Sequence, residues 1–128
     1  MANTATGDLG EVGRSSLSAH EGADFLTIRT ARPMAQASVG FLGVSDGLTR
    51  LRTGRGLGAT YSTTGDKGGA ILLTGQLGRA ASRTETFDIV FGFGTTGAAS
   101  DEAARATLKV GYKAVLDHYE GVLSLIHI

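Results

Sequence analysis

The sequence predicts a mainly β fold that ends in one amphipathic α-helix, and three observations indicate this class. The 128 residues include 20 glycines but one proline, and this glycine density without a triplet period is typical of tight turns between short strands. Apolar residues recur at period two in the segments 70–77 and 87–93. From Ser100 onwards they recur at a helical period instead.

Composition excludes several classes of protein. The 12 basic residues equal the 12 acidic ones, so net charge argues neither for a nucleic-acid partner nor for a membrane surface. No apolar run approaches the roughly 20 residues that a membrane-spanning helix needs. The chain has no cysteine, which excludes a disulfide framework and a thiolate metal site.

The first half of the chain predicts two strands and two loops. Residues 1–19 show no usable period and predict a loop. Residues 23–30 predict a strand that ends before Pro33, because proline cannot donate to a β-ladder. Residues 34–42 predict the next strand, and Asp46-Gly47 predicts a turn after it. We expect residues 43–58 to form a long irregular loop.

The following segment predicts a hairpin and one further strand. Residues 59–62 predict a short strand, 64–69 a hairpin turn, and 70–77 the partner strand, with Ile71, Leu73 and Leu77 on one face. The strand around residue 90 has the clearest pattern. Its apolar face is expected to pack inward and consists of Phe87, Ile89, Phe91 and Phe93.

The last element is predicted as one long helix that begins near Ser100. Ser100 is a suitable N-cap, and Asp101 and Glu102 complement the positive end of the helix dipole. A solvated stripe is expected at Asp101, Arg105, Lys109, Lys113 and Asp117. A buried stripe is expected opposite it, at Ala104, Leu108, Tyr112, Val115 and Tyr119.

One motif suggests a nucleotide site. Gly92 to Gly97 has the spacing GxGxxG after a strand and before a helix, where backbone amides could receive a pyrophosphate. The complete fingerprint needs an acidic residue at the end of a second parallel strand about 20 residues further on. Here that window, around Asp117 and Glu120, is still helical. We therefore interpret the motif as a flexible exit from the last strand.

The remaining polar residues do not assemble into a recognisable site. Arg50, Arg52 and Arg55 could hold an anion or face a sugar, but loop arginines are more often solvated or paired, and we favour that interpretation. Residues 64–69 lack the Gly-Lys-Ser/Thr order of a phosphate loop. The histidines (His20, His118 and His127) lack metal-ligand spacing and complete no catalytic triad. The sequence thus predicts no catalytic, cofactor-binding or metal-binding residue in this chain.

Four motifs in order resemble one family. They are Arg32-Pro33 and the segments 38–47 (SVGFLGVSDG), 68–77 (GGAILLTGQL) and 87–94 (FDIVFGFG). Together, residues from about Gly22 to Val122 resemble the later part of the N-terminal β-sandwich domain of bacterial glycoside hydrolase family 15, the glucoamylase and glucodextranase group. One position departs from this pattern, since the family typically has a tryptophan where this chain has Leu48.

The resemblance implies an antiparallel β-sandwich in front of an (α/α)6 catalytic barrel. Residues 1–98 would form part of a large sandwich, and the helix at 99–122 would lead towards a barrel that is absent from this chain. In the family two glutamates of the barrel act as general acid and general base in an inverting hydrolysis. Glucose is released from the non-reducing ends of α-glucans. The implied partners are the protein's own catalytic domain and, through it, an α-glucan, without a cofactor.

The resemblance also implies that this chain is a fragment. Residues 123–128 (LSLIHI) match the translation of a transposase adapter used in sequencing libraries, and the alternative is an apolar helix tail. Half a sandwich would leave the face of Phe87, Ile89, Phe91 and Phe93 short of partners. A second hypothesis is a stand-alone carbohydrate-binding β-sandwich without enzymatic activity. The absence of tryptophan argues against it, and Tyr61 would be its best stacking residue.

Overall fold

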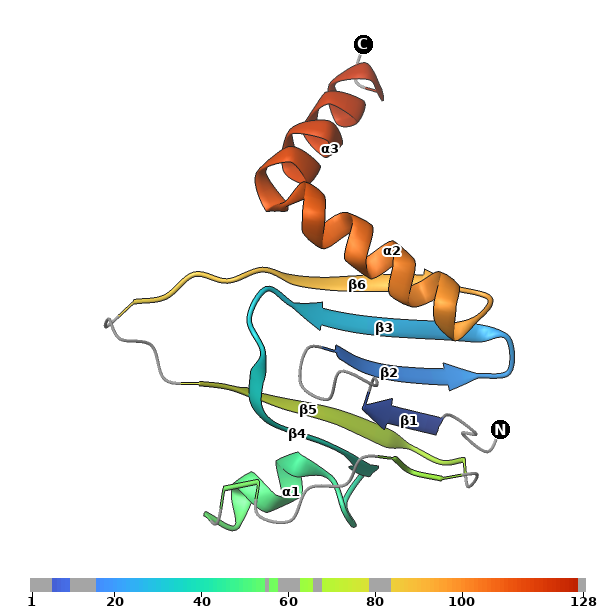
Figure 1. Ribbon diagram of the computed structural model, residues 1–128, viewed down its shortest axis with the longest axis vertical. Helices are drawn as coiled ribbons and strands as arrows, with labels where there is room; N and C mark the ends of the chain where they lie inside the picture. The colour runs from blue at the N-terminus through green and yellow to red at the C-terminus, as the bar shows by residue number, and fades with distance from the viewer. Residues whose placement is uncertain are drawn as a thin grey trace.

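A computed structural model describes residues 6–9, 16–54, 56–57, 63–65, 68–78 and 84–126 (Figure 1). The strands are β1 (Thr6–Leu9), β2 (Ser16–Glu21), β3 (Asp24–Thr30), β4 (Met34–Phe41), β5 (Ile71–Leu77) and β6 (Ile89–Gly94). The helices are α1 (Gly47–Arg52), α2 (Gly97–Val110) and α3 (Tyr112–Ile126). The predicted mainly β, antiparallel class is therefore confirmed.

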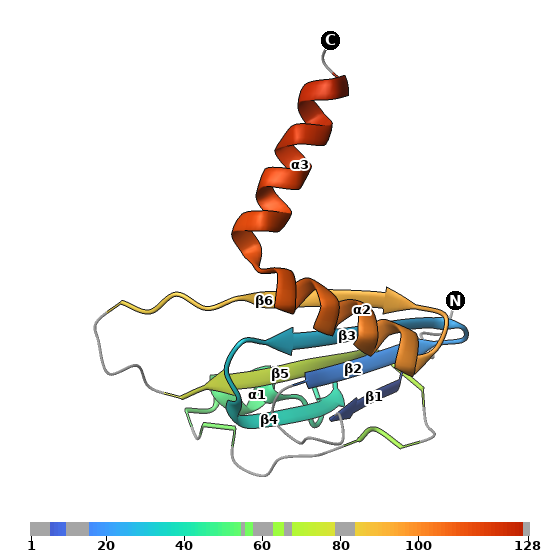
Figure 2. The same ribbon diagram turned by 45° about the horizontal axis from the view of Figure 1, so that its top comes forward.

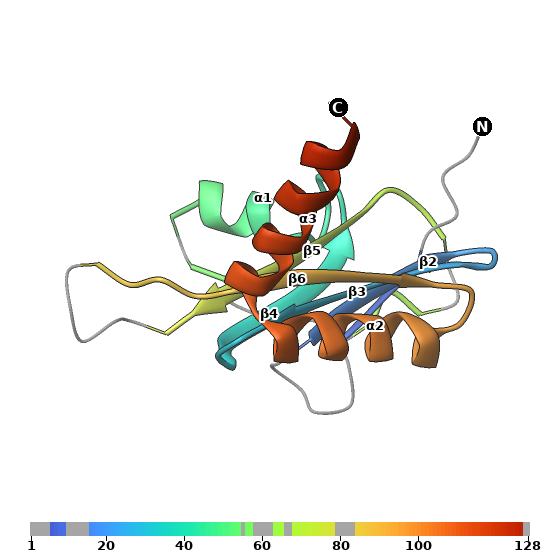
Figure 3. The ribbon, with the colours of Figure 1, turned by 90° about the horizontal axis from the view of Figure 1, so that it is seen from above.

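Two antiparallel sheets pack face to face as a small sandwich. One sheet has the strand order β1-β2-β3-β6 and the other consists of β4 and β5. The core between them contains the buried residues Leu17, Met34, Ala37 and Val39, with Ile28, Leu73 and Leu77 packed against it. Helices lie on the two outer faces, with α1 on the side of β4 and β5 and α2 on the side of β3 and β6 (Figure 3).

The prediction of a loop over residues 1–19 is wrong, because β1 and β2 lie in this segment. Leu9 pairs with Leu17, and Leu17 in turn pairs with Ile28 of β3. Leu9 and Leu17 are the only large apolar residues within β1 and β2, so these strands lack the alternation by which a strand is normally recognised. Main-chain pairing on both sides of β2 forms these strands instead.

The predicted loop at 43–58 contains the short helix α1. Asp46 begins it as an N-cap, since its Oδ1 accepts a hydrogen bond from the Thr49 backbone N–H at 2.9 Å. The turn chemistry of Asp46-Gly47 is thus the start of a helix. Strands 23–30, 34–42 and 70–77 are confirmed as β3, β4 and β5. The strand predicted at 59–62 lies outside the described residues, as does part of the turn at 64–69.

The single predicted C-terminal helix is two helices. The first begins at Gly97, and its N-cap is Thr96, whose hydroxyl oxygen accepts a hydrogen bond from the Ala99 N–H at 3.1 Å. Ser100 is therefore a buried residue inside α2, and Asp101 and Glu102 lie beyond the first turn. The helix stops at Gly111, where φ is +87° and ψ is 157°. The expectations of a Ser100 cap and of one continuous helix are wrong.

Helix α3 departs from the sheet after this break (Figure 2). Its last turns include residues 123–126, which belong to the segment that resembles an adapter sequence. In the part of the chain that the structure describes, neither α3 nor any other helix is long and apolar enough to cross a membrane.

Candidate functional site

Small residues allow α2 to lie directly on β6. A Cβ atom added at Gly92 would come within 2.1 Å of the Ser100 carbonyl oxygen and 2.5 Å of the Ala104 nitrogen. One added at Gly94 would lie 2.7 Å from the Ser100 nitrogen. The GxGxxG motif therefore permits close approach of strand and helix. It is not the flexible exit that we expected, since Gly92 is buried and both glycines are part of β6.

Polar contacts also fix α2 to the sheet. The buried hydroxyl groups of Thr27 and Ser100 are hydrogen-bonded at 2.8 Å. Arg29 Nε on β3 donates to Asp101 Oδ1 at 2.6 Å, and Arg105 Nε donates to Asp101 Oδ2 at 2.8 Å. The hydrogen bond from Arg29, together with that from Arg105, lowers the pKa of Asp101. Asp101, predicted as part of a solvated stripe, therefore connects α2 to the sheet.

The inner face of β6 is open to solvent. The side chains predicted to pack inward have exposed fractions of 38% at Phe87, 49% at Ile89, 56% at Phe91 and 70% at Phe93. They lie on the face of the sheet that bears Ile28, because Phe91 pairs with Ile28. The β4–β5 sheet packs against β1 and β2, and in the described residues it leaves β6 uncovered. The inward packing is wrong for this chain alone, whereas the expected lack of partners is seen.

The predicted buried stripe of the C-terminal helical region is covered in α2 and exposed in α3. Ala104 is buried and Leu108 half-buried against the sheet. Beyond Gly111 the stripe is exposed, by 67% at Tyr112, 41% at Val115 and 59% at Tyr119. Helix α3 thus presents an apolar face for which the described residues supply no covering surface.

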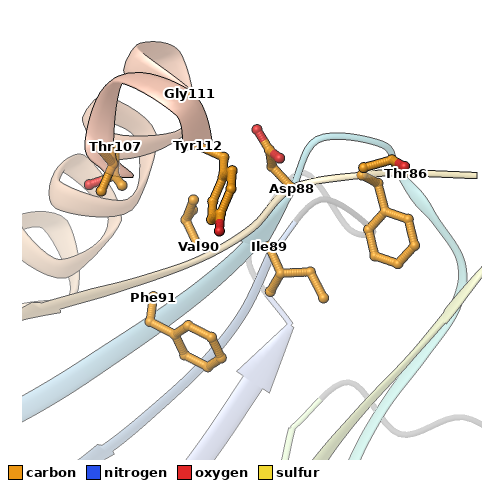
Figure 4. Close-up of a pocket in the computed structure, with 10 residues that line it drawn as sticks. Thr86, Asp88, Ile89, Val90, Phe91, Thr107, Gly111 and Tyr112 are labelled. Atoms are coloured by element: carbon orange, nitrogen blue, oxygen red, sulfur yellow. The ribbon is translucent and has the colours of Figure 1, made fainter. Parts of the chain in front are cut away.

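The open strand and the open helix meet in one apolar cleft, which we call the β6–α3 corner. It has a volume of about 560 Å³ and is lined by residues 86–91 and by Thr107, Gly111, Tyr112 and Val115. Figure 4 shows Val90 and Tyr112 on one side of the strand, and Ile89 and Phe91 on the other. The cleft therefore wraps around the edge of β6. Its lining is mainly apolar and suits apolar surface, and Thr86, Asp88 and Thr107 are its polar members besides the Tyr112 hydroxyl.

A smaller cleft, with a volume of about 470 Å³, lies beside α1 and is lined by Val44, Thr49, Arg50 and Thr53. Arg50 and Arg52 lie in the last turn of α1, where they complement the helix dipole. Arg55 lies outside the described residues. The adjacent Asp46 is buried and also accepts hydrogen bonds from the Gly43 N–H and the Thr49 hydroxyl. The hydrogen bond from the Thr49 N–H lowers the pKa of Asp46 most. The ionised carboxylate therefore stabilises the start of α1, where Asp46 is the N-cap.

The other residues singled out in the sequence lie apart. His20 stacks on Phe25, with ring centroids 4.7 Å apart, and His118 is exposed on α3. His127 and Tyr61 lie outside the described residues. Leu48, which replaces the tryptophan of the resembled family, is 39% exposed on α1. Among the residues described, no three His, Asp or Glu side chains are grouped to hold a metal ion.

We expected the face of β6 to lack partners, but the sequence did not predict that this face and α3 would line one cleft. The contact of α2 with β6 had a usable signal, namely small residues at Gly92 and Gly94 followed by Ser100 and Ala104 one helical turn apart. The exposure of β6 had no local signal, since it depends on where the second sheet ends.

Comparison with known proteins identifies a family and a similar fold. The family model described as glucodextranase, domain N, matches residues 1–122. The crystal structure of a bacterial glucoamylase complexed with acarbose is similar, with a TM-score of 0.79 and 18% sequence identity. The similarity covers 93% of this chain and 17% of that chain, so this chain spans a small part of the glucoamylase. No curated protein sequence matches.

Proposed function

The chain belongs to the family of glucodextranase N domains, and we propose that it serves as a non-catalytic N-terminal β-sandwich domain of a glucoamylase-type glycoside hydrolase. The fold of the bacterial glucoamylase supports this proposal. Residues 1–98 would be part of the sandwich, 99–122 the helical segment that leads towards the catalytic domain, and 123–128 an addition foreign to the fold.

In this proposal the chemistry belongs to an (α/α)6 catalytic domain outside this chain. Two glutamates there would act as general acid and general base, one protonating the leaving oxygen and the other activating water on the opposite face of the sugar. The full-length enzyme would release glucose from the non-reducing ends of α-glucans. The present domain would supply structural support and binds no cofactor in this role.

The observation that best supports a supporting role is the β6–α3 corner. Large apolar side chains such as Phe91 and Tyr112 are more than half exposed there. Contiguous exposed apolar surface of this kind marks an interaction site, and burying it against another part of the polypeptide is favourable. We propose that the rest of the full-length enzyme, including its catalytic domain, is that partner.

The test compares the 128-residue chain with the full-length polypeptide, obtained by extending the gene from both ends. We expect the full-length protein to release glucose from maltooligosaccharides and the short chain to release none. Tyr112→Ala should lower the melting temperature of the full-length protein, because it removes a buried contact there. A full-length protein without activity on α-glucans would contradict the proposal, and an unchanged melting temperature would contradict the packing of α3.

The alternative, a stand-alone carbohydrate-binding module, makes a different prediction. It requires that the short chain binds maltooligosaccharides, with saturable heat in isothermal titration that Tyr61→Ala abolishes. Of the exposed aromatic residues in the described part, Phe87, Phe91 and Tyr112 line the β6–α3 corner, whereas Phe93 and Tyr119 lie outside it on β6 and α3. In the corner they are mixed with aliphatic residues such as Ile89 and Val115, and this apolar lining favours a contact with protein. We therefore keep the supporting role as the conclusion.

A further inference from the structure

We propose that the β6–α3 corner is completed by strand addition: an apolar β-strand from the remainder of the same full-length polypeptide pairs with the free edge of β6. This inference rests on the proposed function, because it assumes that the domain is part of a longer enzyme. It goes further in stating the secondary structure of the contacting segment and the atoms that bind it.

Among the residues that the structure describes, the backbone of β6 is paired on one side only. In the strand order β1-β2-β3-β6, β6 is the last strand, and β3 is its neighbour. The Ala31 N–H donates to the Asp88 carbonyl at 3.0 Å, so the backbone of residue 88 points towards β3. Because this direction alternates along an antiparallel strand, Val90, Gly92 and Gly94 also point towards β3. The N–H and C=O groups of Ile89, Phe91 and Phe93 therefore point towards the free edge.

The same three residues have the exposed side chains. Ile89, Phe91 and Phe93 are 49%, 56% and 70% exposed. Natural edge strands are usually protected from pairing by lysine, proline or an inward charge, and residues 89–94 contain none of these. An added strand would satisfy the unpaired backbone groups and cover these side chains at once. An irregular segment would satisfy fewer of the backbone groups.

The surroundings of the edge specify the added strand further. Tyr112 lies on the Val90 side of β6, and Phe91 lies on the other side (Figure 4). A strand in this position would contact mainly apolar side chains on both of its faces, with Asp88 and Thr107 as polar neighbours on the Val90 side. Strands that are buried on both faces have near-continuous apolar sequences. We therefore expect the added strand to be rich in valine, isoleucine and leucine, without an alternating polar face.

The helices favour a single strand over a second copy of this chain. Identical antiparallel strands are related by a two-fold axis perpendicular to the sheet, which keeps both α2 helices on the same face. The junction of α2 and α3 lies beside β6 on the side away from β3 (Figure 1). Thr107, Gly111 and Tyr112 from this junction line the cleft at the free edge. A second copy would bring its own helices into this space. A lone strand needs only about 4.8 Å beside β6.

The longer polypeptide is the source that the comparisons favour. This chain corresponds to 17% of the length of the similar glucoamylase chain. Most of such a protein lies outside the matched segment and can supply a strand. A strand within the same polypeptide also binds at a high effective concentration, which compensates for the modest strength of one edge pairing.

Amide hydrogen exchange tests the proposal, with the 128-residue chain and the full-length polypeptide measured side by side by NMR. In the short chain the amides of Ile89, Phe91 and Phe93 should exchange fast, whereas those of Val90, Gly92 and Gly94 should be protected. In the full-length protein all six should be protected, with exchange of the first three slowed at least about tenfold. Equally fast exchange of these three amides in the full-length protein would overturn the proposal. Their protection in a short chain that sediments as a dimer would overturn it in favour of a second copy.

A matched pair of proline variants gives a second readout. Phe91→Pro removes an N–H that points to the free edge, and Val90→Pro removes one that pairs with β3. Val90→Pro should lower the melting temperature of both proteins, and Phe91→Pro should lower that of the full-length protein much more than that of the short chain. An equal effect of Phe91→Pro on both would overturn strand addition. Glucose release by the same full-length protein reports separately on the proposed function, which can fail while the amides are protected.

Discussion

Helices α2 and α3 follow one another, have 14 and 15 residues and are both amphipathic, yet they differ in what covers their apolar face. The face of α2 lies on β6, with Ala104 completely buried. The face of α3 is open to solvent along most of its length. An amphipathic pattern states that a helix needs a partner surface, but it does not state whether the same chain supplies that surface.

The difference between the two helices lies in the surface opposite each of them. β6 presents glycine to α2, and the buried pair of Thr27 and Ser100 and the ion pair of Arg29 with Asp101 add directional contacts. The polar contact within α3 is a solvent-exposed pair of Lys113 and Asp117 at 3.2 Å. Four substitutions sharpen this comparison, in order of decreasing effect on stability.

The largest effect is expected from Gly92→Ala. The new Cβ atom would lie 2.1 Å from a backbone oxygen of α2, so the helix must shift away from the sheet. We expect a loss of about 3 kcal/mol in the free energy of unfolding, measured by urea titration followed by circular dichroism. Gly121→Ala is the matched control in α3, where an added Cβ meets nothing within 4 Å. It should stabilise the chain by about 0.8 kcal/mol through helix propensity.

Asp101→Asn should cost about 1 kcal/mol at neutral pH, because Arg29, with a side chain only 12% exposed, loses its charged partner. The folded pKa of Asp101 lies below its ordinary value of 3.8. Its contribution is therefore complete above that pH and is lost as the pH falls through the lowered pKa.

Unfolding of the unchanged chain and of Asp101→Asn, measured as a function of pH, checks the direction of this pH dependence. Their stabilities should differ at pH 7 and converge below about pH 4, and Asp46 titrates in both and cancels. A difference that grows in acid would contradict the assignment. Asp117→Asn is the control in α3, and we expect it to change stability by less than about 0.5 kcal/mol, because both partners are exposed.

Gly111→Ala should change the direction of α3 more than the stability of the chain. Alanine disfavours a φ of +87°, and α3 has few contacts that would hold it in place. We expect α2 and α3 to form one continuous helix, which increases the distance between spin labels at residues 97 and 125. An unchanged distance would show that contacts of α3 with the domain fix its direction.

The smallest effect is expected from Tyr119→Ser. Tyr119 is 59% exposed, so this chain should lose no more than about 0.5 kcal/mol of unfolding free energy. The result is informative because a tyrosine at the same point of a helical stripe would normally be part of a core. A loss of several kcal/mol in urea titration would show that α3 packs on the domain in solution.

The sequence predicted those elements whose side chains repeat at the period of their secondary structure. β5 and β6 follow from apolar alternation, and the C-terminal helical region follows from its stripe. β3 and β4 were predicted from apolar segments on either side of Pro33. β1 and β2 were missed because each contains a single large apolar residue, Leu9 or Leu17. These strands depend on main-chain pairing, of β1 with β2 and of β2 with β3. The N-cap role of Asp46 and the break at Gly111 depend on backbone geometry, which residue type alone leaves open.

The candidate site was predictable only in part. The apolar face of β6 and the stripe on α3 are visible in the sequence, and the resemblance already implied that half a sandwich would leave the first of them uncovered. That both surfaces line one cleft follows only from the three-dimensional arrangement of the elements. It depends on the order of the strands and on the angle between α2 and α3, neither of which a periodic pattern contains.

Gly111 also forms a single-residue hinge between α2 and α3. Hydrogen bonds continue on both sides of it, from the Gly111 N–H to Thr107 and from the Val115 N–H to the Gly111 carbonyl, so a single residue separates two rigid rods. The rod formed by α3 is about 22 Å long at a rise of about 1.5 Å per residue. A rotation of about 10° at this one residue moves its far end by about 4 Å. Small changes in the dihedral angles of this one glycine therefore move the far end of α3 by several ångströms relative to the sheet.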